Sequence, residues 1–255
     1  FHNNPITLRG SKTLGERKTL LEVCDKLIFV SNWVRERFFE GFERKSHNKC
    51  IVIYPSVSPL KKFPKKNKII SFVGKLNRSK GFNVFGNSII KILKKYKEWN
   101  AIVIGDEPRE VYNFKHKRLK YKGWISHKKA LDLYEKTSIS VVPSTWEEPF
   151  GRTAMEAASR GCATIVSKRG GLIETVNDAI FLTEVSQKEV FDKIEFLVKN
   201  KKIRTKIQKK LFYKVLHKLK YNSKKIDLYR DEILKDYNFF VKKDKKLKII
   251  HISNF

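Results

Sequence analysis

Short runs of β-branched residues alternate with longer amphipathic segments between Lys68 and Leu182. The apolar runs predict strands at residues 69–73, 101–104, 119–121, 139–142, 163–166 and 180–182. The amphipathic segments predict helices at about residues 83–96, 128–136, 152–160 and 172–176. Since strands that alternate with helices form right-handed βαβ units, we expect an α/β fold with a parallel sheet covered on both faces. Residues 69–186 are therefore predicted to form a Rossmann-like domain.

The first 60 residues repeat this alternation over a shorter length. The pattern predicts a helix, a strand, a second helix and a second strand at residues 14–23, 26–30, 31–44 and 50–54. Because two strands and two helices cannot enclose a core of their own, residues 1–60 are interpreted as the end of a second α/β domain. Residues 61–68, rich in Lys, are the predicted linker between the domains.

Beyond Ser186 the pattern becomes helical and basic. Residues 187–246 are predicted to be C-terminal helices, at about residues 187–199, 203–218 and 224–237. Residues 247–255 are predicted to be a strand that begins a further unit. Because the chain opens on Phe1-His2-Asn3-Asn4-Pro5 rather than on Met, we expect the sequence to be an excerpt of a longer protein.

The chain is strongly basic, with 56 Lys and Arg against 26 Asp and Glu and a net charge of +30. Such a charge favours polyanions, which include nucleic acid, an anionic membrane surface and phosphorylated substrates. A general preference for Lys at solvated positions explains the charge about equally well, because the Lys pairs fall mostly on predicted helix faces and linkers.

Composition also limits the kinds of site that are expected. No apolar run approaches the roughly 18–20 residues of a membrane span, so no spanning helix is predicted. The 3 cysteines are widely separated and are interpreted as small buried residues in a reducing compartment. The histidines other than His2 lack metal-ligand spacing and are predicted to be surface or packing residues: His47, His116, His127, His217 and His251.

The segment Gly-Lys-Leu-Asn-Arg-Ser-Lys-Gly, residues 74–81, lies between a predicted strand and a predicted helix. Lys75 and Lys80, flanked by Gly74 and Gly81, form a candidate grip for a diphosphate. A solvated basic loop explains the same residues about equally well. Because the segment lacks the Gly-Lys-Ser/Thr of a Walker loop, and no dinucleotide fingerprint follows, neither P-loop ATP nor NAD is expected.

A stronger signal lies in residues 143–157. The predicted helix that starts at Arg152 follows Phe150 and Gly151 directly, and its free backbone N–H groups favour an anion. Glu148 before this helix and Glu156 within it suit sugar hydroxyls, because an ionised carboxylate accepts two hydrogen bonds. Glu156 has apolar neighbours that favour burial over an ordinary surface position, and a buried carboxylate needs a partner. An anion site between two carboxylates predicts a sugar nucleotide.

Together these motifs resemble the retaining GT-B glycosyltransferases of the group 1 family. Residues 74–81 resemble the family's G-R-x-x-x-x-K-G, and Glu148 with Glu156 resembles its E-x7-E. Further matching segments are Gly123-Trp124-Ile125, Pro143-Ser144, Gly161 to Ser167 and Gly170 to Glu174. The resemblance implies a complete C-terminal GT-B domain that binds the donor, preceded by the end of the N-terminal domain.

The resemblance also implies roles for single residues. Lys75 and Lys80 would hold the donor diphosphate, Glu148 would face the donor sugar, and Glu156 would bind the ribose. Lys75 stands where the family usually has Arg, so a point charge replaces a bidentate fork. The backbone of Trp124 and Ile125 would read the base, and the remaining donor-binding residues expected are Gly74, Phe150, Gly151, Arg152 and Gly170.

His2 resembles the family's histidine that approaches the donor sugar and the acceptor, the alternative being an unordered terminus. The last residues resemble the first strand of such enzymes, so we expect an excerpt of a tandem glycosyltransferase.

The function implied is transfer of a hexose from a nucleotide-diphosphate sugar to an acceptor hydroxyl, with retention of configuration. No metal or other cofactor is expected, because the sequence lacks an Asp-x-Asp motif. The acceptor expected is a glycan or a lipid-linked glycan, as in bacterial lipopolysaccharide synthesis, on the cytoplasmic side and with peripheral contact to an anionic membrane. Two alternatives are a fragment that binds the donor without turnover and a polyanion-binding protein; a nucleic-acid partner is not expected.

Overall fold

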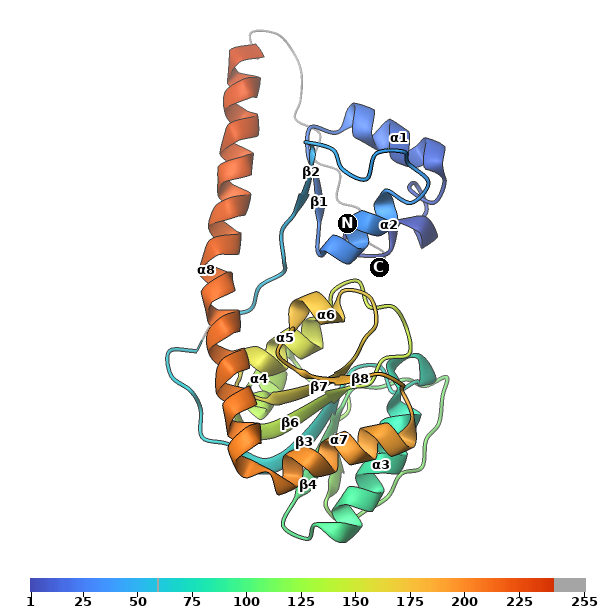
Figure 1. Cartoon of the computed structure of the whole chain (residues 1–255), viewed down its shortest axis with the longest axis vertical. Coiled ribbons are helices and arrows are strands. Elements are labelled where there is room, and N and C mark those ends of the chain that lie inside the picture. The colour runs from blue at the N-terminus through green and yellow to red at the C-terminus, as the bar shows by residue number, and fades with distance from the viewer. Residues whose placement is uncertain (59, 241–255) are drawn as a thin grey trace. The chain divides into compact units, whose positions relative to one another are not determined.

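The structure is a computed structural model that describes residues 1–58 and 60–240 (Figure 1). Its contacts divide the chain into two compact units. One contains residues 1–56 together with the described residues from Lys218 to Phe240, and the other contains the described residues of 57–217. The strand predicted at residues 247–255 lies outside the described residues. None of the helices in the described ranges is both long enough and apolar enough to cross a membrane.

A parallel sheet of 6 strands forms the centre of the unit of residues 57–217. Its strands are β3 (Asn67–Val73), β4 (Asn100–Ile104), β5 (Leu119–Tyr121), β6 (Thr137–Val142), β7 (Ala163–Ser167) and β8 (Ile180–Leu182). Both faces of the central strands are buried, which is why their sequences are apolar runs without alternation. The sheet confirms the predicted α/β class.

Helices cover both faces of this sheet (Figure 1). On one face α3 (Phe82–Lys95) and α7 (Gln187–Lys199) pack against each other and on the sheet residues Ile70, Phe72 and Val103. On the other face α4 (His127–Lys136) and α5 (Arg152–Ser159) contact the central strands. There Ile102 and Ile104 of the sheet pack with Ala130 of α4. A short helix, α6 (Leu172–Thr175), follows β7.

The strand order, β5-β4-β3-β6-β7-β8, places β3 beside β6 at the centre of the sheet. The chain extends the sheet to one side through β4 and β5, and then to the other side through β7 and β8. The carboxyl ends of β3 and β6 therefore form a topological switch point, where α/β sheets bind ligands. Residues 74–81 and 143–151 both leave the sheet at this point.

The unit that contains the N-terminus has two parallel strands, β1 (Leu27–Phe29) and β2 (Cys50–Val52). The helices before β2 are η1 (Pro5–Thr7), α1 (Leu14–Val23) and α2 (Asn32–Phe38). Its core is aromatic: the ring of Phe29 lies 5.2 Å from those of Phe1 and Phe38. The predicted helix to residue 44 was too long, because the chain turns at Phe39 to pack that ring on Phe38 and Phe42.

One helix, α8 (Lys201–Phe240), replaces the two helices predicted at residues 203–218 and 224–237. The residues between the two predictions include neither Gly nor Pro, so nothing in the local sequence ends the helix there. Its beginning is fixed to the unit of residues 57–217. The amide of Gln208 donates to Ser138 O at 2.8 Å, and the ring of Phe212 lies 5.4 Å from that of Phe63.

Lys66, in the predicted linker, is a cation that holds the ends of two helices. Its Nζ donates to Tyr134 O at 2.9 Å, Glu135 O at 3.0 Å and Arg160 O at 2.6 Å. These carbonyl groups end α4 and α5, where helices leave carbonyls without intrahelical partners and favour a cation. Burial lowers the pKa of Lys66. The three hydrogen bonds from its ammonium group to carbonyl oxygens stabilise the charged form.

Replacing Lys66 by Met should lower the free energy of unfolding by about 2–4 kcal/mol, because several buried carbonyl groups lose their donor. Urea denaturation at pH 7 measures this loss. The matched control is Lys65→Met at the neighbouring exposed position, with an expected change within about 0.5 kcal/mol. Equal stability of the two variants would show that the three bonds contribute nothing net.

Candidate functional site

The candidate site lies where the loops after β3 and β6 meet. Ser79 O, in the short helix η2 (Arg78–Lys80), accepts hydrogen bonds from the loop after β6. Its donors are Thr145 N at 2.9 Å, Trp146 N at 3.2 Å and Ser144 Oγ at 3.1 Å. The basic segment and the carboxylate segment recognised in the sequence are therefore joined directly.

Gly81 lets these two loops come into contact. It adopts a left-handed conformation with φ of 71°. A Cβ atom at this position would lie 1.9 Å from Pro143 O, closer than any side chain tolerates. Only glycine satisfies both the backbone conformation and the space.

This contact brings Lys80 and Glu148 together. Lys80 Nζ lies 2.6 Å from Glu148 Oε1, with the Lys80 side chain 31% exposed and the Glu148 side chain 12% exposed. Lys75, by contrast, is exposed and has no ion pair with any residue in the described ranges. Of the two lysines predicted to hold the diphosphate, Lys80 is therefore held in place by an ion pair, whereas Lys75 is exposed and unpaired among the described residues.

Glu156 is buried on α5, as its apolar neighbours predicted. His127 Nε2 lies 3.0 Å from Glu156 Oε1, and Arg152 Nη2 lies 3.6 Å from the same oxygen. His127 is exposed, as predicted for a surface residue, and it also contacts the buried Glu156, which sequence reasoning missed. The signal available in the sequence was that His127 lies close to Trp124 and Ile125. The contact itself joins α4 to α5, so it depends on tertiary structure and could not be predicted from spacing along the chain.

The start of α5 and the glycine pair at residues 170–171 complete this side of the site. Gly151 caps α5 without a side-chain hydrogen bond, and Phe150 before it is buried. Gly171 N donates to Glu148 O at 2.7 Å, and a Cβ on Gly170 would lie 2.3 Å from that oxygen. These glycines hold the backbone of Glu148 in place.

Trp124 and Ile125 follow β5 on the other side of the switch point. The Trp124 side chain is 82% exposed, whereas Ile125 is partly buried against Ile102, Ile104 and Ala130. Gly123 O accepts from Gly105 N at 2.9 Å, which joins this loop to the end of β4. Gly74, at the end of β3, donates to Ile104 O at 3.0 Å.

His2 is exposed and belongs to the other unit, so its role stays a prediction from the resemblance. Within the described part of the chain, no three side chains of His, Cys, Asp or Glu gather as metal ligands would.

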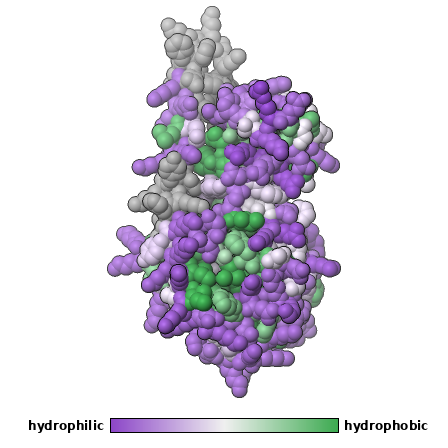
Figure 2. All heavy atoms as spheres, in the orientation of Figure 1, coloured by the Kyte–Doolittle hydropathy of each residue, from purple (hydrophilic) through white to green (hydrophobic). Residues whose placement is uncertain are grey.

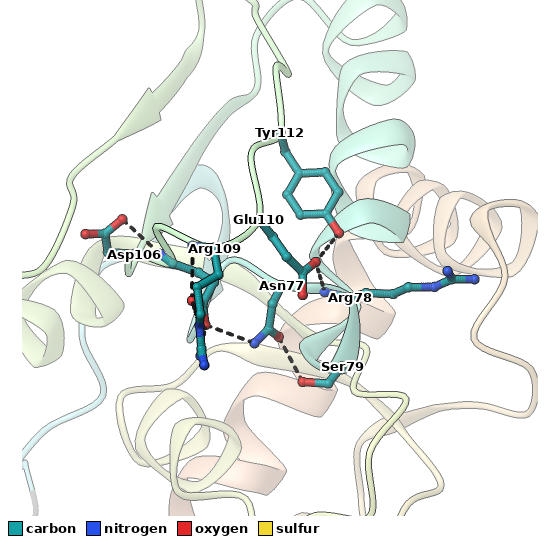
Figure 3. Close-up of polar contacts among 8 residues, drawn as sticks. Asn77, Arg78, Ser79, Asp106, Arg109, Glu110 and Tyr112 are labelled. Atoms are coloured by element: carbon teal, nitrogen blue, oxygen red, sulfur yellow. Dashed lines mark hydrogen bonds and ion pairs between the residues drawn. The ribbon is translucent and has the colours of Figure 1, made fainter.

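A polar network that sequence reasoning missed fixes residues 77–80 (Figure 3). Asn77 Oδ1 accepts from Lys80 N at 3.0 Å and from Ser79 Oγ at 2.9 Å. Glu110 Oε2 accepts from Arg78 N at 2.8 Å and from Tyr112 Oη at 2.7 Å. Burial and this carboxylate raise the pKa of Tyr112 to about 12. The backbone N–H groups of Arg78 and Lys80 are therefore already used, and the side chain of Lys80 remains to contact an anion.

Glu107 supports the same segment from the loop after β4. Its buried carboxylate receives two bonds from the Arg109 guanidinium, at 2.6 and 2.8 Å, and lies 3.4 Å from Asn77 Nδ2. These bonds, those from Arg109 above all, lower the pKa of Glu107 to about 2. The ionised form of Glu107 therefore stabilises the site.

With this geometry established, the chain can be compared with known proteins. Residues 58–212 match the family model of the glycosyl transferases group 1. The chain belongs to this family. Among curated relatives, it is 26% identical over 174 residues to the lipopolysaccharide core biosynthesis mannosyltransferase LpsB of Rhizobium meliloti, covering 64% of this chain and 46% of that protein.

It is also 28% identical over 162 residues to an uncharacterized 42.6 kDa protein of the cps region of Klebsiella pneumoniae, covering 62% of this chain and 42% of that protein. The chain thus spans about half or less of the length of these curated relatives.

Solved glycosyltransferases share the fold. Anabaena HepE superposes with a TM-score of 0.73 at 16% identity, covering 92% of this chain and 71% of HepE. The sucrose-phosphate synthase of Thermosynechococcus elongatus gives a TM-score of 0.69 at 20% identity, covering 93% of this chain and 66% of the synthase. These likenesses confirm the predicted GT-B fold.

Gly81→Ala should destabilise the unit of residues 57–217 by at least about 3 kcal/mol, because the new Cβ overlaps Pro143 and strains the backbone. Gly123→Ala is the matched control, since Gly123 also has a positive φ, 61°, but no atom near its Cβ position. Its cost should be about 1–2 kcal/mol. Equal unfolding midpoints in urea for the two variants would contradict the importance of the contact.

Stability should also depend on pH through Glu107. Its pKa in the folded chain, about 2, lies below the ordinary 4.5, so its stabilising effect is present above about pH 4.5 and is lost as the pH falls toward 2. Glu107→Gln should therefore be less stable than the parent chain at pH 7, with the difference shrinking below pH 4.5. The exposed Glu98→Gln is the control. A pH-independent difference in unfolding free energy would refute this role.

Proposed function

We propose that this glycosyltransferase binds a nucleotide-diphosphate sugar at the switch point and transfers the hexose to an acceptor hydroxyl with retention of configuration. The observation that carries the proposal is the Lys80–Glu148 pair, 2.6 Å apart at the carboxyl ends of the central strands. A cation for the diphosphate and a carboxylate for sugar hydroxyls stand side by side. HepE, which shares the fold, has been crystallised in complex with UDP-glucose.

In the proposed complex Lys80, Lys75 and the uncapped start of α5 surround the diphosphate. As the bond between the anomeric carbon and the phosphate oxygen breaks, negative charge grows on the leaving diphosphate, and these groups stabilise it. Glu148 exchanges its bond to Lys80 for hydroxyl groups of the sugar, which frees Lys80 for the phosphate. Gly170 and Gly171 keep the Glu148 backbone in position for this exchange.

Retention follows when the acceptor oxygen bonds to the anomeric carbon on the face that the diphosphate leaves. The acceptor proton passes to an oxygen of the leaving phosphate, so neither a protein base nor a covalent intermediate is needed. We propose no metal cofactor, since the lysines and the start of α5 supply the positive charge.

Glu156 would bind the ribose, and the loop of Trp124 and Ile125 would contact the base. Glu156 is buried on α5, about one turn after the start of the helix, where the anion site is proposed. This position suits the ribose, which neighbours the diphosphate in a nucleotide. In the whole protein His2 would approach the sugar and the acceptor.

The acceptor we propose is a glycan or lipid-linked glycan of the bacterial cell surface. The names of two relatives support this pathway: a lipopolysaccharide core mannosyltransferase and a protein of a cps region. We place the reaction on the cytoplasmic side, with peripheral contact to an anionic membrane favoured by the net charge of +30. This polypeptide by itself would bind the donor without turnover if acceptor contacts lie outside it.

The net charge of +30 also supports a second candidate function, binding of polyanions. Figure 2 shows hydrophilic residues spread over most of the visible face, with apolar groups between them. This even distribution is more typical of polar side chains exposed to solvent than of a continuous surface that binds a polyanion. The two functions differ in salt dependence and in nucleotide selectivity.

Isothermal titration of the chain with UDP, GDP and ADP, at low and moderate salt, separates the candidates. We expect saturable binding of one nucleotide, weakened in Glu156→Ala and unchanged in Glu184→Ala, which removes an exposed carboxylate of the same unit. Equal binding of all three that salt abolishes would support the polyanion function instead.

In the whole enzyme, Lys80→Ala should lower the rate of nucleotide release from the donor sugar, with acceptor present, by about 100-fold or more, because a preorganised charge is lost. Lys91→Ala, an exposed lysine on α3, is the control and should leave the rate unchanged. An unchanged rate in Lys80→Ala would remove Lys80 from the reaction.

A further inference from the structure

His127 and Glu156 form a contact between α4 and α5. The loop of Trp124 and Ile125 directly precedes α4 in the chain. His127 is the first residue of α4, and Ser126 before it caps the helix through Lys129 N at 3.4 Å. His127 Nε2 lies 3.0 Å from Glu156 Oε1. The His127 side chain is 54% exposed, whereas that of Glu156 is 8% exposed.

This contact is more than an exposed ion pair, because one of its members is buried. A buried carboxylate without a donor is expensive, and the exposed imidazole supplies one from outside. Arg152 also approaches Glu156, at 3.6 Å, but from the same helix and with a side chain 65% exposed. Among the described residues, His127 is the one that joins the Glu156 carboxylate to α4, next to the loop of Trp124 and Ile125.

The two oxygens of Glu156 are in different states. His127 and Arg152 both approach Oε1. No side chain in the described ranges donates to Oε2, which is also absent from the buried polar atoms that lack a partner. Oε2 therefore has no side-chain donor among the described residues and can accept hydrogen bonds from a ligand.

We infer that His127 is a positioning residue, which holds Oε1 of Glu156 so that Oε2 is presented to the ribose hydroxyls. The inference rests on the proposed function and adds to it a determinant of ribose recognition. Without His127, the side chain that remains near Oε1 in the described ranges is that of Arg152, at 3.6 Å, so the orientation of the other oxygen is held less firmly. Discrimination between ribose and 2′-deoxyribose then falls, although Glu156 is still present.

The test compares the dissociation constants of UDP, GDP and ADP with those of their 2′-deoxy counterparts by titration calorimetry. For the nucleotide that binds, the parent chain should prefer the ribose form by about tenfold, as expected for a hydrogen bond to a charged group. His127→Ala should remove most of this preference, and His127→Gln should restore part of it, because an amide N–H can donate to Oε1. Lys128→Ala, the next residue on α4 and exposed, should leave it unchanged.

The outcomes separate the inference from the proposed function. Loss of the preference in Glu156→Ala but full preference in His127→Ala would overturn the role of His127 and leave the donor site intact. Failure of every nucleotide to bind the parent chain, or an unchanged preference in Glu156→Ala, would overturn the donor site and the inference with it. His127→Ala removes a donor from a buried carboxylate, so its unfolding midpoint in urea should fall slightly below that of Lys128→Ala. Titrating both variants under conditions where the urea curves show them fully folded excludes a general loss of folding as the cause.

Discussion

The candidate site depends on one contact, between residues 74–81 and 143–151 at the junction of β3 and β6. Ser79 O accepts two backbone hydrogen bonds across this junction, and the absent side chain of Gly81 makes room for Pro143. The two loops come from strands that are far apart in the sequence and adjacent in the sheet. Lys80 and Glu148 lie within ion-pair distance because this contact fixes both loops.

Charge is used in two ways, one at the amino ends of the strands and the other at the carboxyl ends, where the junction lies. Some cations hold helix ends: Lys66 bonds the last carbonyls of α4 and α5, and Arg118 donates to Tyr96 O at 2.9 Å and Trp99 O at 2.8 Å, where α3 ends. Carboxylates, in turn, hold the basic loop, as Glu107 and Glu110 do. The loop that carries Lys80 is thus ordered before a ligand arrives, which lowers the cost of binding one.

Much of the fold could be predicted from local pattern. Buried parallel strands have continuous apolar sequences, so each strand of the central sheet was recognisable, and the strand-helix alternation predicted the parallel topology. The end of α2 was not predictable from local pattern, because packing of Phe39 decides it. The continuity of α8 could have been predicted, because no Gly or Pro separates the two helices that were expected there.

The site was predictable where a motif lies within one segment, as for Glu148 and Glu156, and less so elsewhere. The bonds of His127 to Glu156 and of Glu110 to Arg78 connect residues from different elements, and spacing along the chain contains no trace of them. The structure also distinguishes the two lysines of the basic loop, since Lys80 is paired with Glu148 and Lys75 has no ion pair among the described residues.

The central claim is that Lys80, Glu148 and Glu156 face a single bound sugar nucleotide. A crystal structure of the chain soaked with a nucleoside diphosphate tests it most directly. We predict the diphosphate between Lys80 and the start of α5, with the ribose hydroxyls on Glu156 Oε2 and the base beside Trp124. Density for the nucleotide at another surface, with the Lys80–Glu148 pair intact, would contradict the claim.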